Sequence, residues 1–244
     1  MNSTAIASQQ QSPLPAPMKT REKLSREEIN SLPLFHYEGR INLARSMEDV
    51  EEAVEALSRE PVLGFDTETP PSFRKGKSYS PTLVQLAGAH EVWLFHLKWQ
   101  PLGDGLISLF ENPDIIKTGV AVHDDMRFLS KITPFTARSV VDLSEIARRN
   151  KVENRGLRGL AAAFLGLRIS KGEQCSSWGN SELSARQIRY AATDAWASRA
   201  VYLSMVEAGL DFDVDTTPQP SRGKRVPRSS QPQRRGKRPP RPAR

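Results

Sequence analysis

The sequence predicts an α/β fold in which one mixed β-sheet is flanked by helices. Short runs of β-branched and aromatic residues alternate with longer stretches of helical periodicity, and Gly, Pro, Asn or Asp bounds the short runs. The first short runs follow one another directly, whereas helical stretches separate the later ones. We therefore expect an antiparallel hairpin that parallel strands extend into one sheet.

The expected strands lie between residues 62 and 141. The turn at 87–91, with Gly88 at its corner, is predicted to join the second and third strands as a hairpin. In chain order the strands are Val62–Glu68, Thr82–Leu86, Val92–Phe95, Ile115–Val120 and Val140–Val141. Capping signals, such as Ser46 followed by Asp49, and helical periodicity mark the helices. These are Met47–Arg59, Leu106–Glu111, Asp124–Lys131, Leu143–Asn150, Leu157–Leu165 and Ser184–Glu207.

Composition divides the 244 residues into one folded domain, at 35–212, and two tails. Residues 1–34 are rich in Gln, Pro and Ser and then carry mixed charge, so we expect a flexible leader. Residues 213–244 are rich in Pro and Arg without periodicity, which predicts a disordered basic tail. Residues 216–244 contain ten Lys and Arg residues and no acid. Since this positive charge exceeds the net charge of the whole chain, +7, the rest of the chain is mildly acidic.

Several classes of protein are excluded by the sequence. The apolar runs are far shorter than the roughly 20 residues of a membrane span, so no membrane partner is expected. One cysteine, Cys175, excludes an intramolecular disulfide and a multi-cysteine zinc site. The four histidines lack ligand spacing, and we interpret them as structural. Without a secretory signal the expected location is the cytoplasm, or the nucleus or an organelle in a eukaryote.

The first candidate site is the pair Asp66 and Glu68. Alternate side chains of a strand share a face, so the two carboxylates project together. Adjacent carboxylates repel each other, and a cation between them relieves that repulsion. The alternative is an exposed strand end whose acids are solvated.

Two further candidates lie on helices. Tyr190 and Asp194 are four residues apart and share one helical face, although a buried Tyr with an exposed Asp has the same spacing. Asp124 and Asp125 lie at a helix start, where acids act as caps. Asp125 shares the inward side of Phe128 and Leu129, so Asp124 is the better candidate for the cap and Asp125 for a site.

The order of these motifs resembles the tyrosine branch of the DEDD superfamily of 3′-to-5′ exonucleases, notably ribonuclease D and Werner-syndrome-type exonuclease domains. Val84-Gln85-Leu86 is similar to the family's Gln-Leu strand. The C-terminal signature matches at Lys171, Gln174, Ser177, Trp178, Leu183, Gln187 and the run from Tyr190 to Ala195. The resemblance covers about residues 40 to 205 and implies a ribonuclease-H-like fold.

This resemblance implies a catalytic set of Asp66, Glu68, Asp125, Tyr190 and Asp194. Ligands that are all oxygen suit two Mg²⁺ or Mn²⁺ ions rather than zinc. Asp66 would bridge the ions, Glu68 and Asp194 would complete one, and Asp125 would reach the second, largely through water. Since a tyrosine with a pKa near 10 is a poor base, Tyr190 is expected to orient the attacking water.

The predicted function is therefore a metal-dependent exonuclease that releases nucleoside monophosphates from the 3′ end of single-stranded nucleic acid or of a 3′ overhang. RNA and DNA both remain open, as does the oligomeric state. We expect the basic tail to contact the phosphate backbone; a solubilising tail or a nuclear localisation signal are the alternatives. Trp178 either stacks on a base or, as we prefer, packs within its loop.

Two rival functions remain. One is a catalytically silent nucleic-acid-binding module with the same fold and basic tail, against which the intact set of acids argues. The other is a subunit that is active only within a larger complex.

Overall fold

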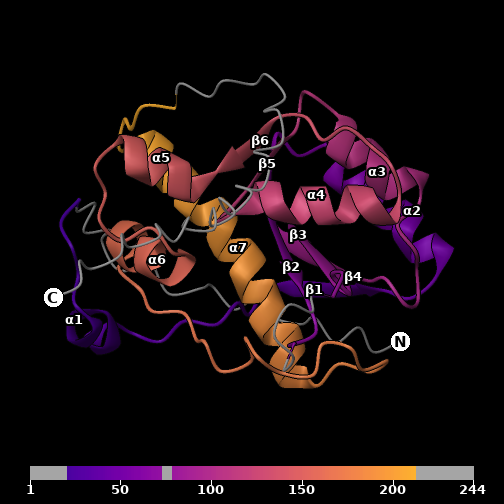
Figure 1. Cartoon of the computed structure of the whole chain (residues 1–244), viewed down its shortest axis with the longest axis horizontal. Coiled ribbons are helices and arrows are strands. Elements are labelled where there is room, and N and C mark those ends of the chain that lie inside the picture. Colours follow the sequence, from indigo (N-terminus) through magenta and orange to yellow (C-terminus); the bar gives the residue numbers. More distant parts are fainter. Residues whose placement is uncertain (1–20, 73–78, 213–244) are drawn as a thin grey trace, which may run out of the picture.

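The computed structural model describes residues 21–72 and 79–212, which form a mixed six-stranded sheet with helices on both faces (Figure 1). The strands are β1 (Arg40–Ala44), β2 (Val62–Glu68), β3 (Leu83–Ala87), β4 (Glu91–His96), β5 (Ile116–Gly119) and β6 (Val140–Asp142), in the order β1-β4-β3-β2-β5-β6. The antiparallel strands β2, β3 and β4 form the centre, β1 runs parallel to β4, and β5 and β6 extend the sheet parallel to β2. The predicted mixed sheet and its hairpin are confirmed.

The helices form a layer on each face of the sheet. They are α1 (Arg26–Ser31), α2 (Met47–Leu57), α3 (Asp104–Glu111), α4 (Val122–Ile132), α5 (Leu143–Arg149), α6 (Leu157–Leu165) and α7 (Ala185–Glu207). One core lies between the sheet and α2, α3 and α4, and the other face is covered by α5, α6 and α7. No helix in this described part of the chain has both the length and the apolar character needed to cross a bilayer.

Successive residues of strand β2 point to opposite faces of the sheet, and so to the two helical layers in turn. Phe65 points into the core beneath α2, α3 and α4, where its ring meets Phe110 edge-on at 5.8 Å. Gly64 points to the opposite face, where a Cβ would lie 2.0 Å from the carbonyl oxygen of Ala195. Helix α7 therefore crosses β2 at a distance that only glycine permits. The same alternation places Asp66 and Glu68 on the side of α7.

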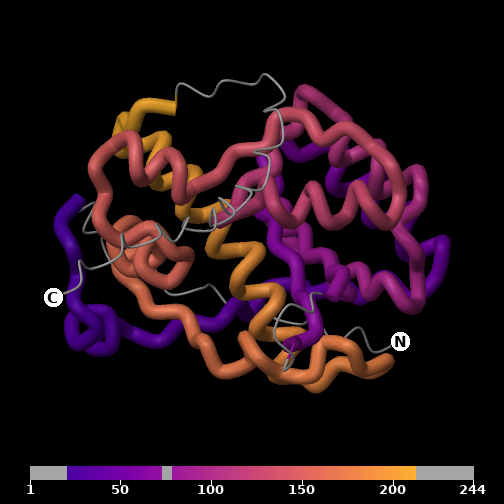
Figure 2. Tube along the Cα trace, in the orientation of Figure 1, coloured from indigo at the N-terminus to yellow at the C-terminus, as the bar shows by residue number. Residues whose placement is uncertain are grey.

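The structure corrects the predicted flexible leader at residues 21–34. A capping box between Ser25 and Glu28 begins α1, and the backbone N–H of Leu24 donates to Asn154 Oδ1 at 2.7 Å. Leu34 bridges Arg168, so this segment runs beside α6 before reaching the sheet (Figure 2). The rest of the predicted leader and the basic tail lie outside the described residues. Strand β1 was also missed, although Ile41 and Leu43 alternate with polar residues as they do in a half-buried strand.

Candidate active site

Three carboxylates converge where the end of β2 meets α7. Asp66 and Glu68 extend from the sheet, Asp194 extends from the helix, and one oxygen of each lies within 4.8 Å of the others. Glu68 and Asp194 are buried, whereas Asp66 keeps partial exposure. The interpretation of Asp66 and Glu68 as solvated acids at an exposed strand end is therefore wrong, as is that of Asp194 as an exposed acid.

The sequence of α7 explains how the helix reaches this position. A capping box between Ser184 and Gln187 fixes its start. Ala191, Ala192 and Ala195 are fully buried against the sheet, and their small side chains allow the helix to lie close to β3 and β4. Together with Gly64, this small-residue face brings the carboxylate of Asp194 to those of β2.

The electrostatics of the cluster favour a bound cation. Burial, followed by repulsion from Asp194 and Asp125, holds the pKa of Asp66 well above its usual value. Burial and then the neighbouring carboxylates raise the pKa of Glu68 to about 10, and burial raises that of Asp194 to about 7. Buried like charges are stable only when they are protonated or neutralised. Because the donors are all carboxylate oxygens, the site fits a hard divalent cation such as Mg²⁺ or Mn²⁺.

Tyr190 adds a hydrogen-bond donor to the cluster. Burial, followed by the charges of Asp194 and Glu68, raises the pKa of its hydroxyl, and the Tyr190 and Asp194 side chains line the same two cavities. A phenol with a raised pKa stays protonated at neutral pH, so it donates a hydrogen bond and does not act as a base.

Asp125 lies beside the cluster and is connected to β2 through the side chain of Thr67. The Thr67 hydroxyl donates to Asp125 Oδ1 at 2.7 Å, and burial raises the pKa of this carboxyl to about 6. Asp124 is exposed and accepts from Arg127 at 2.8 Å. Its predicted capping role is wrong, because α4 begins two residues earlier than predicted, after Ala121, which has a positive φ of 60° and no side-chain cap.

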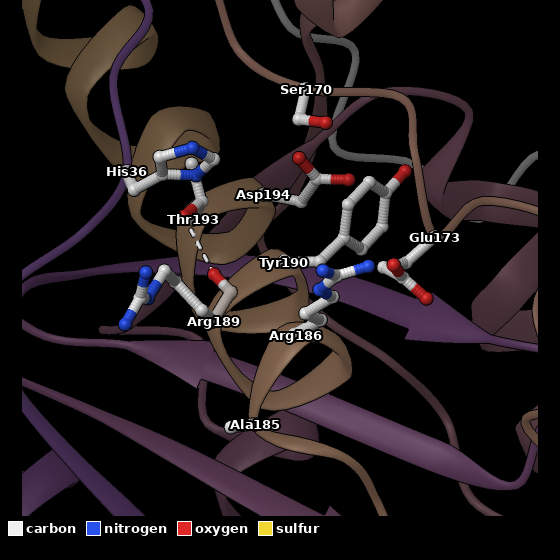
Figure 3. Close-up of a pocket in the computed structure, with 9 residues that line it drawn as sticks. All are labelled: His36, Ser170, Glu173, Ala185, Arg186, Arg189, Tyr190, Thr193 and Asp194. Atoms are coloured by element: carbon white, nitrogen blue, oxygen red, sulfur yellow. Dashed lines mark hydrogen bonds between the residues drawn. The ribbon is translucent and has the colours of Figure 1, made fainter.

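Two cavities, each of about 370 Å³, flank the wall formed by Ser170, Tyr190 and Asp194. One contains the carboxylates of β2 and is also lined by Arg158 and Lys171. The other lies over the start of α7 (Figure 3). In this view Arg189 and His36 lie on one side of the helix, and Arg186 and Glu173 lie on the other.

Sequence reasoning missed several residues at the site. No sequence signal marked Thr67, whose hydroxyl donates to Asp125 Oδ1. Arg158 and Arg186 carried no motif, and only their positive charge signalled a role. Trp178 is fully buried with its ring 6.1 Å from that of Tyr190, so packing, not stacking on a base, describes its place.

Solved structures establish the class of fold. The exonuclease domain of Nibbler from Aedes aegypti matches with a TM-score of 0.63 and 23% identity, over 72% of this chain and 93% of that one. Ribonuclease D from Trypanosoma brucei, in complex with RNA, matches with a TM-score of 0.58 and 20% identity, over 78% of this chain and 66% of that one. The fold is thus the ribonuclease-H-like fold of exonuclease domains, as the resemblance implied.

Sequence comparison then gives the family. A family model described as 3′-5′ exonuclease matches residues 42–209. The bifunctional 3′-5′ exonuclease/ATP-dependent helicase WRN of Mus musculus is 31% identical over 190 residues, which are 74% of this chain and 14% of that protein. Ribonuclease D of Gluconacetobacter diazotrophicus is 31% identical over 173 residues, 68% of this chain and 42% of that protein. The chain belongs to the 3′-5′ exonuclease family and spans less than half the length of these two relatives.

Burial of the Asp194 carboxyl predicts a stability effect in the absence of metal. The pKa of Asp194 rises from 3.8 to about 7 on folding, so metal-free protein is most stable, with respect to this group, below its unfolded pKa and loses that stability as the pH rises through about 7. We expect Asp194→Asn in EDTA at about pH 8 to raise the free energy of unfolding by about 1–3 kcal/mol. Thermal denaturation at about pH 5 and pH 8 measures this.

Asp124→Asn is the matched control, since it removes one exposed acid near the site and should change stability by less than about 0.5 kcal/mol. Adding Mn²⁺ should stabilise the wild type and the control but not Asp194→Asn. Equal stabilisation of all three by Mn²⁺ would contradict a cation site at this carboxylate.

Proposed function

We propose that the chain is a metal-dependent 3′-to-5′ exonuclease that hydrolyses phosphodiester bonds at the 3′ end of nucleic acid and releases nucleoside monophosphates. The observation that carries the proposal is the cluster of Asp66, Glu68 and Asp194, whose oxygens lie within 4.8 Å of one another. A catalytically silent binding module has no need of repelling, largely buried carboxylates. Membership of an exonuclease family supports an active enzyme over a silent binding module.

In the proposed mechanism the carboxylates hold two Mg²⁺ or Mn²⁺ ions. Asp66, Glu68 and Asp194 would hold one ion, and Asp66 together with Asp125, which Thr67 holds outside the cluster, would hold the second, Asp125 largely through water. When bound, the ions lower the pKa of the attacking water and stabilise the leaving oxygen. Tyr190 keeps its proton and orients that water with its hydroxyl, since its pKa is raised by burial.

Basic side chains around the site suit a phosphate backbone. Arg158 and Lys171 line the cavity that contains the carboxylates, and Arg186 and Arg189 line the neighbouring one. Neither Arg186 nor Arg189 forms an ion pair within the described residues. We propose that a single strand or a 3′ overhang enters here. The related ribonuclease D solved with RNA supports RNA as a substrate, and the helicase-linked relative is an exonuclease by name.

The basic tail is proposed as a second contact with the substrate. Its ten cations within residues 216–244 neutralise phosphates regardless of sequence. A mildly acidic body gains most from such a contact, because the body itself repels a polyanion.

The ladder assay tests the activity. With Mn²⁺ or Mg²⁺ the wild type should shorten a 5′-labelled single strand stepwise, and Asp66→Asn should lower the rate by more than about 100-fold because a bridging ligand is lost. Asp124→Asn, outside the cluster, should retain the rate. An undegraded strand with wild-type protein refutes the enzyme and leaves the binding module.

Loss of Arg186 and Arg189 should weaken substrate binding and leave the chemical step intact. For the double variant Arg186→Gln/Arg189→Gln we expect KM to rise at least about tenfold with kcat little changed, since charge-assisted contacts to phosphate are lost. Arg148→Gln/Arg149→Gln removes the same charge from exposed positions on α5 and should keep the wild-type KM. Equal KM values for the two double variants would place the strand elsewhere.

Deleting residues 213–244 should weaken binding to long strands and flatten its dependence on salt, because fewer counterions are released. Cleavage of short oligonucleotides should persist. Binding is measured by fluorescence anisotropy over a series of salt concentrations, and an unchanged affinity at low salt would disprove the tail contact.

A further inference from the structure

Gln85 lies at the centre of β3 and is fully buried, yet neither atom of its side-chain amide has a hydrogen-bond partner. Unpartnered buried amides are uncommon in folded proteins, because each lost hydrogen bond with water destabilises the fold. A side chain needed only for packing at this place would be apolar. The amide therefore requires an explanation.

The register of the sheet identifies its neighbours. Gln85 pairs with Asp66 on β2 and with Leu94 on β4, and Leu83 and Ala87 share its face on β3. The alanine-rich face of α7 covers this part of the sheet. Of the four sheet neighbours, Asp66 alone has a polar side chain.

The carboxylate of Asp66 has acceptor capacity to spare. Its Oδ1 accepts the backbone N–H of Thr67 at 2.9 Å, and a carboxylate offers about four acceptor positions in all. Directly paired residues of an antiparallel ladder have Cβ atoms about 4.5–5.5 Å apart, within reach of a glutamine amide directly or through one buried water. An Asp that binds a divalent cation is ionised, and ionised acceptors form the stronger hydrogen bonds.

We propose that Gln85 is a positioning residue for Asp66. When the carboxylates hold a divalent cation, the Gln85 Nε2 group donates to Asp66, directly or through one buried water, and fixes the orientation of that carboxylate. Gln85 touches neither cation nor substrate. The proposal rests on the proposed function, since it requires the metal site but not the nuclease reaction.

The test compares two substitutions on the same face of the sheet. Gln85→Met removes the amide and keeps the length of the side chain, whereas Leu94→Met installs the same residue beside it and tests packing alone. Mn²⁺ affinity is measured by calorimetry, and melting temperature is measured in EDTA and in Mn²⁺. We expect Gln85→Met to weaken Mn²⁺ binding by about 10–100-fold, as loss of a residue that orients a metal ligand does, while its melting temperature in EDTA is equal to or above that of the wild type. Leu94→Met should bind Mn²⁺ within about twofold of the wild type.

The outcomes separate the proposals. Wild-type affinity in Gln85→Met overturns the role of Gln85 and leaves the metal site standing, and so does an equal loss in Leu94→Met, which would assign the effect to packing. A wild type that binds no Mn²⁺ overturns the metal site as well. Gln85→Leu repeats the test if the methionine variant does not fold.

Discussion

The close crossing of α7 over β2 is the contact on which the site depends. Gly64 leaves no side chain between the strand and the carbonyl of Ala195, so the helix lies directly on the strand. One residue further along the same face, Asp66 meets Asp194, and Glu68 follows. A Cβ at Gly64 would push the helix outward and separate the carboxylates of the two elements. The geometry of the carboxylate cluster is therefore set by a backbone contact.

Such a cluster destabilises the fold that holds it, and the rest of the domain has to offset this. The two apolar layers supply that stability: Phe65, Phe110 and the helices α2, α3 and α4 on one face, and α5, α6 and α7 on the other. Alternation along β2 lets a single strand serve both purposes, with Phe65 in the core and its neighbours in the site. Burial then raises the pKa values of the carboxylates, because it disfavours their ionised forms. A bound cation neutralises that charge and is therefore favoured at the same residues.

Sequence periodicity predicted what depends on short-range geometry. Period two placed Asp66 and Glu68 on one face, and a spacing of four placed Tyr190 with Asp194. The elements that sequence periodicity missed depend on partners far along the chain or on the backbone conformation. Strand β1 exists because it pairs in parallel with β4, and α1 is held by contacts such as Leu24 with Asn154, far along the chain. The start of α4 follows from the left-handed backbone of Ala121, which no residue pattern announced, so the capping role given to Asp124 failed. The choice of Asp125 for the site remains a prediction, with its bond to Thr67 in its favour.

The protonation of Tyr190 and that of the carboxylates depend on pH in different ways. This difference affects how the occupancy of a metal site here would depend on pH. Burial and neighbouring charge keep the phenol protonated, so it remains a hydrogen-bond donor across the neutral range. Two of the carboxylates have pKa values near that range, because burial raises the pKa of Asp194 to about 7 and that of Asp125 to about 6. Protons and cations therefore compete for the same oxygens, and a lower pH demands more metal to fill the site. A histidine in place of Tyr190 would add its own titration near neutral pH and a positive charge beside the cations. A tyrosine avoids both effects, so the pH dependence of the site belongs to its carboxylates alone.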